Sequence, residues 1–191
     1  MIDPPTTPIP RAGRATRFGP VMVALAAGAA VSVALGLYAG LHEPTGVAVN
    51  LAGFSSFMAV KTWLTTVAVV LAIGQLLSAL ALFGKLPGVS GGRGVAALHR
   101  WSGRLAVAVT VPVAAHCLFA LGFQTFDTRI LLHSLLGCFF YGVFVCKMLV
   151  LTREDSPGWV LPTVGGAVFA AMVALWFSSA YWFFTTFGVT F

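Results

Sequence analysis

Five apolar segments, each about twenty residues long, dominate the sequence, and an α-helix of this length crosses the hydrocarbon core of a membrane. Only 8% of the 191 residues are charged and 59% are apolar, whereas soluble domains carry roughly 25% charged residues. A water-soluble fold is therefore excluded. The sequence predicts an all-α integral membrane bundle of five transmembrane helices in contact with the lipid bilayer. The predicted spans are 21–41, 63–83, 105–123, 130–151 and 160–184.

The basic residues predict how this bundle is oriented. Nine of them flank the span ends on the side of the N-terminus, namely Arg11, Arg14, Arg17, Lys85, Arg93, Arg100, Arg104, Lys147 and Arg153. The opposite side has only Lys61 and Arg129. Loops rich in Lys and Arg stay in the cytoplasm, so we expect a cytoplasmic N-terminus and a C-terminus outside. The net charge of +6 therefore indicates topology, and a nucleic-acid partner is not expected.

The domain organisation is simple. Residues 1–19 are rich in Pro, Thr and Arg and have no apolar period, which predicts a disordered cytoplasmic tail. Residues 20–187 are expected to form a single transmembrane domain. The bias toward Ala, Val, Gly and Arg is typical of a bacterium with a GC-rich genome, so the expected location is a bacterial cytoplasmic membrane, with several crossings.

Small residues recur every fourth position in two of the spans. The first span carries Ala24, Gly28, Ser32, Gly36 and Gly40, and the fifth carries Gly166, Ala170, Ala174 and Ser178. Such stripes let helix backbones approach closely. The partner helices are either in the same chain, in a second copy or in another membrane subunit.

Two histidines give the sharpest functional signal. His116 lies in the third span and His133 in the fourth, on either side of a short loop around residues 124–127. In an antiparallel hairpin they would lie at similar depth, roughly 5 to 12 Å below the outer interface at about 1.5 Å per residue. Two imidazoles level with each other are the arrangement that ligates haem iron from both sides. We therefore predict His116 and His133 as metal ligands of one b-type haem.

Neighbouring residues on the fourth span fit the same interpretation. Arg129 precedes His133 by one turn and could pair with a haem propionate, and Gly137 follows by one turn and leaves room for a flat porphyrin. Both are predicted cofactor-binding residues, with aromatic walls from Phe140, Tyr141 and Phe144. Two other interpretations of the histidines remain open: polar contacts that stabilise the bundle, and a pathway for protons or a substrate.

The other two histidines have weaker indications. His99 lies in Leu98-His-Arg-Trp-Ser-Gly-Arg-Leu105 at the cytoplasmic end of the third span. It is either part of an interfacial anchor for anionic lipid or part of a site for a quinone headgroup or a second haem. His42 is expected to be a solvated loop residue, with the alternative that it replaces one member of the outer pair.

The stretch LHRWSGRL, His116 in PVAAHCLF and His133 in ILLHSLLG resemble small membrane cytochromes b, in the broad group of cytochrome b561 and ferric-reductase-like transmembrane domains. The resemblance covers residues 95–151. It implies a helical bundle that holds b-type haem through histidine pairs and moves single electrons. Those families commonly use two pairs, whereas here the inner end has only His99.

We therefore expect an electron-transfer protein at the outer face of the membrane, a redox subunit more than a stand-alone enzyme. Its redox partner would be a quinone or an exported redox protein. The alternative is a non-haem subunit that anchors or packs within a larger complex of membrane subunits. The small-residue stripes motivate this alternative.

Overall fold

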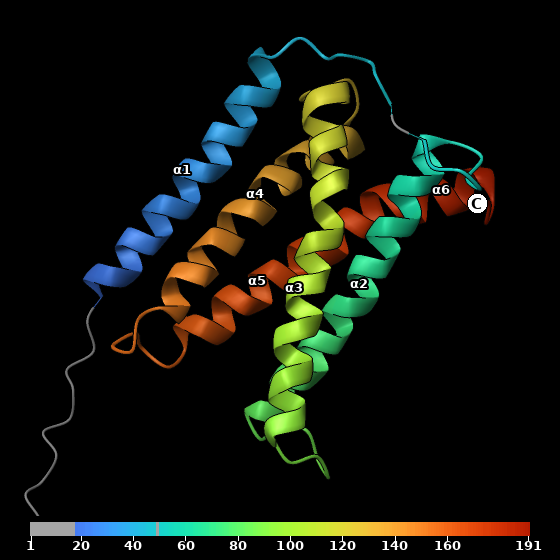
Figure 1. The fold of residues 1–191 in the computed structure, drawn as a ribbon. Coiled ribbons are helices and arrows are strands. Elements are labelled where there is room, and N and C mark those ends of the chain that lie inside the picture. Colours follow the sequence, from blue (N-terminus) through green and yellow to red (C-terminus); the bar gives the residue numbers. More distant parts are fainter. Residues whose placement is uncertain (1–17, 49) are drawn as a thin grey trace, which may run out of the picture.

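The computed structural model describes residues 18–48 and 50–191, which form a bundle of helices (Figure 1). The α-helices are α1 (Gly19–Leu41), α2 (Phe57–Leu82), α3 (Arg93–His116), α4 (Thr128–Leu151), α5 (Val160–Trp176) and the short α6 (Trp182–Phe187). Two π-helical turns, η1 (Cys117–Leu121) and η2 (Phe177–Tyr181), continue α3 and α5. Within the described residues, five helices are long and apolar enough to cross a membrane, which confirms the predicted all-α class and number of spans. The predicted tail lies outside the described residues as far as residue 17.

Two helices begin earlier than hydropathy predicts. The helix α2 starts at Phe57, where the Ser56 hydroxyl accepts a hydrogen bond from Ala59 N at 3.2 Å and caps the first turn. The helix α3 starts at Arg93, so the polar stretch around His99 is helical. The first turns of α3 are missed because they are polar, and the apolar first turn of α2 is missed because Lys61 and Thr62 separate it from the predicted span.

The five long helices form two close pairs and a fifth helix that joins them (Figure 1). One pair is α1 with α4, and the other is α2 with α3, while α5 contacts both α4 and α2. We call the end of the bundle where α1 and α3 finish and α4 begins the Arg129 end, and the opposite end the Lys147 end. The pairing differs from the hairpin expected from the sequence, because α3 and α4 share no extended packing surface among the described residues.

The pair α1 and α4 owes its closeness to the stripe of small residues on α1. A Cβ atom added at Gly28 would lie 2.6 Å from the Gly142 carbonyl oxygen, and one added at Gly142 would overlap the Ser32 hydroxyl. Only hydrogen fits at both glycines, so the two backbones are in direct contact. The stripe of α1 therefore packs within the chain. On α5, by contrast, Gly166 and Ala170 are exposed.

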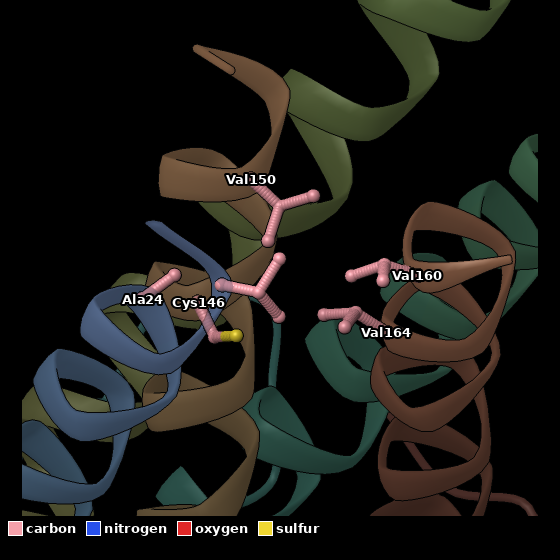
Figure 2. Close-up of a cluster of buried hydrophobic side chains, with 6 residues drawn as sticks. Ala24, Cys146, Val150, Val160 and Val164 are labelled. Atoms are coloured by element: carbon pink, nitrogen blue, oxygen red, sulfur yellow. The ribbon is translucent and has the colours of Figure 1, made fainter. Parts of the chain in front are cut away.

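The buried core follows the same arrangement. Near the Lys147 end, small and branched side chains from α1, α4 and α5 meet in one cluster, formed by Val21, Ala24, Cys146, Val150, Val160 and Val164 (Figure 2). A second cluster joins α2, α4 and α5 at mid-length, where Phe140 is only 1% exposed. These clusters hold α5 against both pairs.

Candidate functional site

A cavity of about 500 Å³ lies inside the bundle toward the Arg129 end. All five long helices contribute residues to its wall, including α3 and α4. Most of the wall surface is apolar, although more than a third of the lining residues have polar side chains, mainly hydroxyl groups. This size and composition are typical of sites that enclose a small molecule or a cofactor.

His133 lines the cavity from α4, and its ring is fixed by a serine of η2. The His133 Nδ1 atom lies 2.9 Å from the Ser178 hydroxyl oxygen. That hydroxyl has one hydrogen, which it donates to the Leu175 carbonyl at 3.0 Å. The hydrogen-bond network therefore assigns the proton to Nδ1 of His133 and the free lone pair to Nε2. A histidine held in this way at Nδ1 presents Nε2 as a metal ligand or a proton acceptor.

Arg129 lines the same cavity and is held in place by three contacts. Its Nη1 donates to the Ser178 carbonyl at 2.8 Å, and its guanidinium lies 4.1 Å from the centre of the Trp182 ring. The carboxylate of Asp127 is 3.9 Å away and also caps α4 by accepting from Ile130 N at 2.8 Å. Arg129 thus presents a positioned positive charge, because its long side chain has little freedom left to lose when an anion binds.

Gly137 also lines the cavity, as predicted for a residue that leaves room for a ligand. A Cβ atom added there would meet no atom within 4 Å. Of the three expected aromatic walls, Phe140 and Tyr141 line the cavity and Phe144 does not. Tyr141 donates a hydrogen bond to the Thr110 hydroxyl at 2.9 Å and so joins α4 to α3 beside the cavity.

His116 lies outside the wall of the cavity. Its ring packs on Phe57 of α2, with the ring centres 5.1 Å apart, and its Nε2 is buried without a hydrogen-bond partner. Val113 and Cys117 on the same helix do line the cavity. Successive residues are about 100° apart around a helix, so His116 lies on the face beside theirs. The structure therefore brings His133, Arg129 and Gly137 together on the cavity wall and leaves His116 outside this group, packed on Phe57.

Both π-helical turns border the cavity. In η1 the Gly122 amide donates to the Cys117 carbonyl at 2.9 Å, one residue further back than in an α-helix. The carbonyl groups of Phe119 and Ala120 at its end accept from the amides of Thr45 and Gly46. In η2 the freed carbonyl of Ser178 accepts from Arg129. Single π turns inside α-helices are frequent at functional sites, because they release backbone groups and re-aim side chains.

Lys61 also lines the cavity, although the sequence suggested a role for it only in the orientation of the bundle. It lies on α2 and is half-buried, and its positive charge is close enough to act on the rings of both His116 and His133. Among the residues that line the cavity there is no Asp or Glu. Ser56 is a typical helix N-cap, and a helix that begins after it at Phe57 includes Lys61. This cap is the sequence signal that places Lys61 on α2.

The remaining histidines have structural partners. The Nδ1 atom of His99 is 3.0 Å from the hydroxyl of Ser78, whose hydrogen goes to the Gly74 carbonyl at 2.6 Å, so α3 is tied to α2 there. Gln75 strengthens the link by donating to the His99 carbonyl and to the Ser102 hydroxyl. His42 stacks on Tyr38, with 5.2 Å between ring centres, and its Nε2 lies 3.3 Å from the Phe119 carbonyl oxygen.

The side chains near the cavity can be compared with the ligands that a metal ion or a haem requires. No group of three or more His, Cys, Asp or Glu side chains gathers in the described part of the chain to hold a metal ion. A haem needs from the protein only one or two axial ligands, an apolar pocket and partners for its carboxylates. His133, the cavity wall and Arg129 fit these requirements. The Nε2 atom of His116 is unpartnered but lies outside the cavity wall.

Comparison with known proteins gives a family without an assigned activity. No curated protein and no solved structure matches the chain. The model of a family of unknown function, DUF6529, matches residues 21–191. Since this covers most of the sequence, the chain belongs to the DUF6529 family.

Proposed function

We propose that this protein binds a b-type haem in the cavity and transfers single electrons at the Arg129 end of the bundle. The observation that carries the proposal is the 2.9 Å contact between His133 Nδ1 and the Ser178 hydroxyl, which engages Nδ1 and leaves Nε2 of this cavity residue free of that contact. Imidazole is a good ligand for haem iron, and an ionisable residue inside a membrane is a functional candidate by default. When bound, the haem would supply the one-electron redox couple.

The other residues have separate roles in this proposal. Ser178 orients the His133 ring, and Arg129 would bind a haem carboxylate. Gly137 would leave space for the porphyrin, and the apolar wall would limit the access of water. A low-dielectric, mostly apolar surrounding shifts the potential of a bound redox group and slows side reactions.

His116 is proposed as the second axial ligand. Its Nε2 is buried without a partner, and a π turn begins at the next residue. Its ring lies beside the cavity wall, since Val113 and Cys117 of the same helix line the cavity.

The location and orientation are part of the same proposal. The bias toward Ala, Val, Gly and Arg supports a bacterial cytoplasmic membrane, and the excess of basic residues on the N-terminal side supports placing the Arg129 end outside. There an exported redox protein or a quinol in the outer leaflet could exchange electrons with the site.

An optical spectrum of the purified protein, oxidised and then reduced, tests the proposal. Protein produced with adequate haem should show a Soret band and a low-spin reduced spectrum. His133→Ala should abolish binding, and His116→Ala should convert the spectrum to high spin. The matched controls His42→Ala and His99→Ala should keep the parent spectrum.

A colourless preparation that also fails to bind added haem would overturn the proposed function. If it co-purified with stoichiometric membrane partners, the alternative role as an anchor or packing subunit would gain support. A low-spin spectrum that survives His116→Ala would remove only the assignment of the second ligand.

A further inference from the structure

Lys61 and Arg129 place two positive charges on the wall of one membrane cavity. Lys61 comes from α2 and Arg129 from α4, so the charges belong to different helix pairs. No carboxylate lines the cavity, and Asp127, which is paired with Arg129, already caps α4. Within the described residues, Lys61 has no ion-pair partner.

A lysine without a partner is costly inside a membrane. It can reach toward the headgroups, or it can pair with an anion that enters the cavity. Attraction between opposite charges is stronger where water is scarce, so an anionic ligand group would offset the cost of burying Lys61.

The rest of the cavity defines the remainder of the ligand. Away from the two cations, most of the wall surface is apolar, with side chains such as Leu35, Val113, Phe140 and Met172, and the polar groups there are mainly uncharged hydroxyls. A fully ionic or strongly hydrated ligand would lose its hydration there without replacement. The matching ligand therefore has a large apolar body and one or two acidic groups at one end.

We infer that Lys61 is a ligand-binding residue that, together with Arg129, selects an amphiphilic carboxylate for the cavity. The ligand is either a porphyrin with carboxylate side chains or a long-chain fatty acid. The porphyrin case rests on the proposed function, and the fatty-acid case does not. Iron is not required for this recognition, since the two cations bind carboxylates and not the metal.

Binding of acids and their esters to the purified protein tests the inference. The probes are metal-free protoporphyrin IX and dibrominated stearic acid, each compared with its methyl ester, in a non-ionic detergent at low salt. Binding is followed by quenching of tryptophan fluorescence, because Trp182 lies on the cavity wall. Metal-free porphyrin cannot use an axial histidine, so the readout is separate from haem ligation.

The parent protein should bind at least one acid more tightly than its ester. Lys61→Met should weaken binding of that acid by at least about tenfold and leave the ester unaffected, as expected for loss of one member of a charge pair. Lys61→Arg should retain binding. Lys85→Met removes the same charge from an exposed loop position and is the matched control, with parent affinity expected.

The outcomes separate the two proposals. Fatty-acid binding that depends on Lys61, without porphyrin binding, supports the inference and contradicts the haem function. Equal affinities of acid and ester, or of Lys61→Met and Lys85→Met, overturn the inference even if haem binds normally. Failure of both acids to bind also overturns it. The ester affinity of Lys61→Met shows whether that variant keeps an intact cavity.

Discussion

The hydroxyl of Tyr141 donates a hydrogen bond to the Thr110 hydroxyl at 2.9 Å, and this bond joins α4 to α3 beside the cavity. Thr110 passes its own hydrogen to the Val107 carbonyl at 2.7 Å. The two helices otherwise lack an extended contact surface among the described residues. Among the described residues, this polar pair therefore links two helices that do not pack along their length.

Tyr141→Phe is therefore expected to weaken this side of the cavity. It removes the donor while Thr110 keeps its bond to Val107, so we expect a loss of about 1 kcal/mol in stability, the usual contribution of such a bond. Thermal unfolding in detergent measures this. An unchanged midpoint would show that the hydroxyl pair does not hold α3 to α4. Phe139→Leu, at an exposed position of α4, is the control and should leave the midpoint unchanged.

Two neighbouring serines of η2 allow a matched test of the orientation of His133. Ser178 and Ser179 both donate to the Leu175 carbonyl, but only Ser178 also accepts from His133. Ser178→Ala should free the His133 ring and mix its two tautomers, while Ser179→Ala should keep the proton on Nδ1. Nitrogen NMR of labelled histidine distinguishes the tautomers. A His133 signal that is identical in both variants would contradict the assigned hydrogen-bond network.

Two glycines on α4 are expected to respond in opposite ways to the same change. Gly142→Ala forces a Cβ atom against the Ser32 hydroxyl and the Gly28 backbone, so a loss of about 1–3 kcal/mol is expected. Gly137→Ala places its Cβ in open space and should be neutral or more stable by up to about 1 kcal/mol, because alanine favours helix. Thermal unfolding of the two variants compares them. Equal losses would contradict the close contact of α1 with α4.

The cavity space at Gly137 predicts a further difference between two substitutions at this position. Gly137→Leu should fill part of the cavity and weaken binding of the acid probe by at least about tenfold, since a ligand and the new side chain need the same space. Gly137→Ala should bind nearly as well as the parent. Tryptophan quenching provides the affinities, and the thermal midpoint shows whether each variant is folded. Parent-like binding by a folded Gly137→Leu variant would place the ligand elsewhere.

The orientation can be tested by labelling single cysteines from one side of intact cells. With the three native cysteines replaced, Thr125→Cys should react with a membrane-impermeant maleimide and Lys85→Cys should not. This result follows from placing the basic loops in the cytoplasm. The opposite labelling pattern would invert the proposed topology without changing the fold.

Hydropathy predicted the five crossings because each needs about twenty apolar residues. It could not predict the pairing of α1 with α4, which depends on Gly28 meeting Gly142 across a long sequence separation. For the histidines, counting residues from the loop predicts a depth but says nothing of the helix face on which they lie. His133 shares a face with Arg129 and Gly137 at four-residue spacing, and His116 is displaced from the corresponding face of α3.

Lys61 was missed for a related reason. Ser56 caps α2 ahead of the predicted start at residue 63, so Lys61, which the sequence analysis placed outside the span, lies on the helix and on the cavity wall. The two π turns have no sequence signal of their own, because any α-helix can accept an extra residue if its neighbours satisfy the released carbonyl groups.

The contact between Gly28 and Gly142 gives α1 an influence over a site that these glycines do not touch. His133 and Arg129 are carried by α4, and the distance of α4 from α1 is set by residues too small to be replaced. Substitutions on the stripe of α1 can therefore abolish ligand binding in a genetic screen although every ligand-binding side chain is intact. Second-site revertants of such variants would be expected at small residues of the facing helix, and not around the cavity.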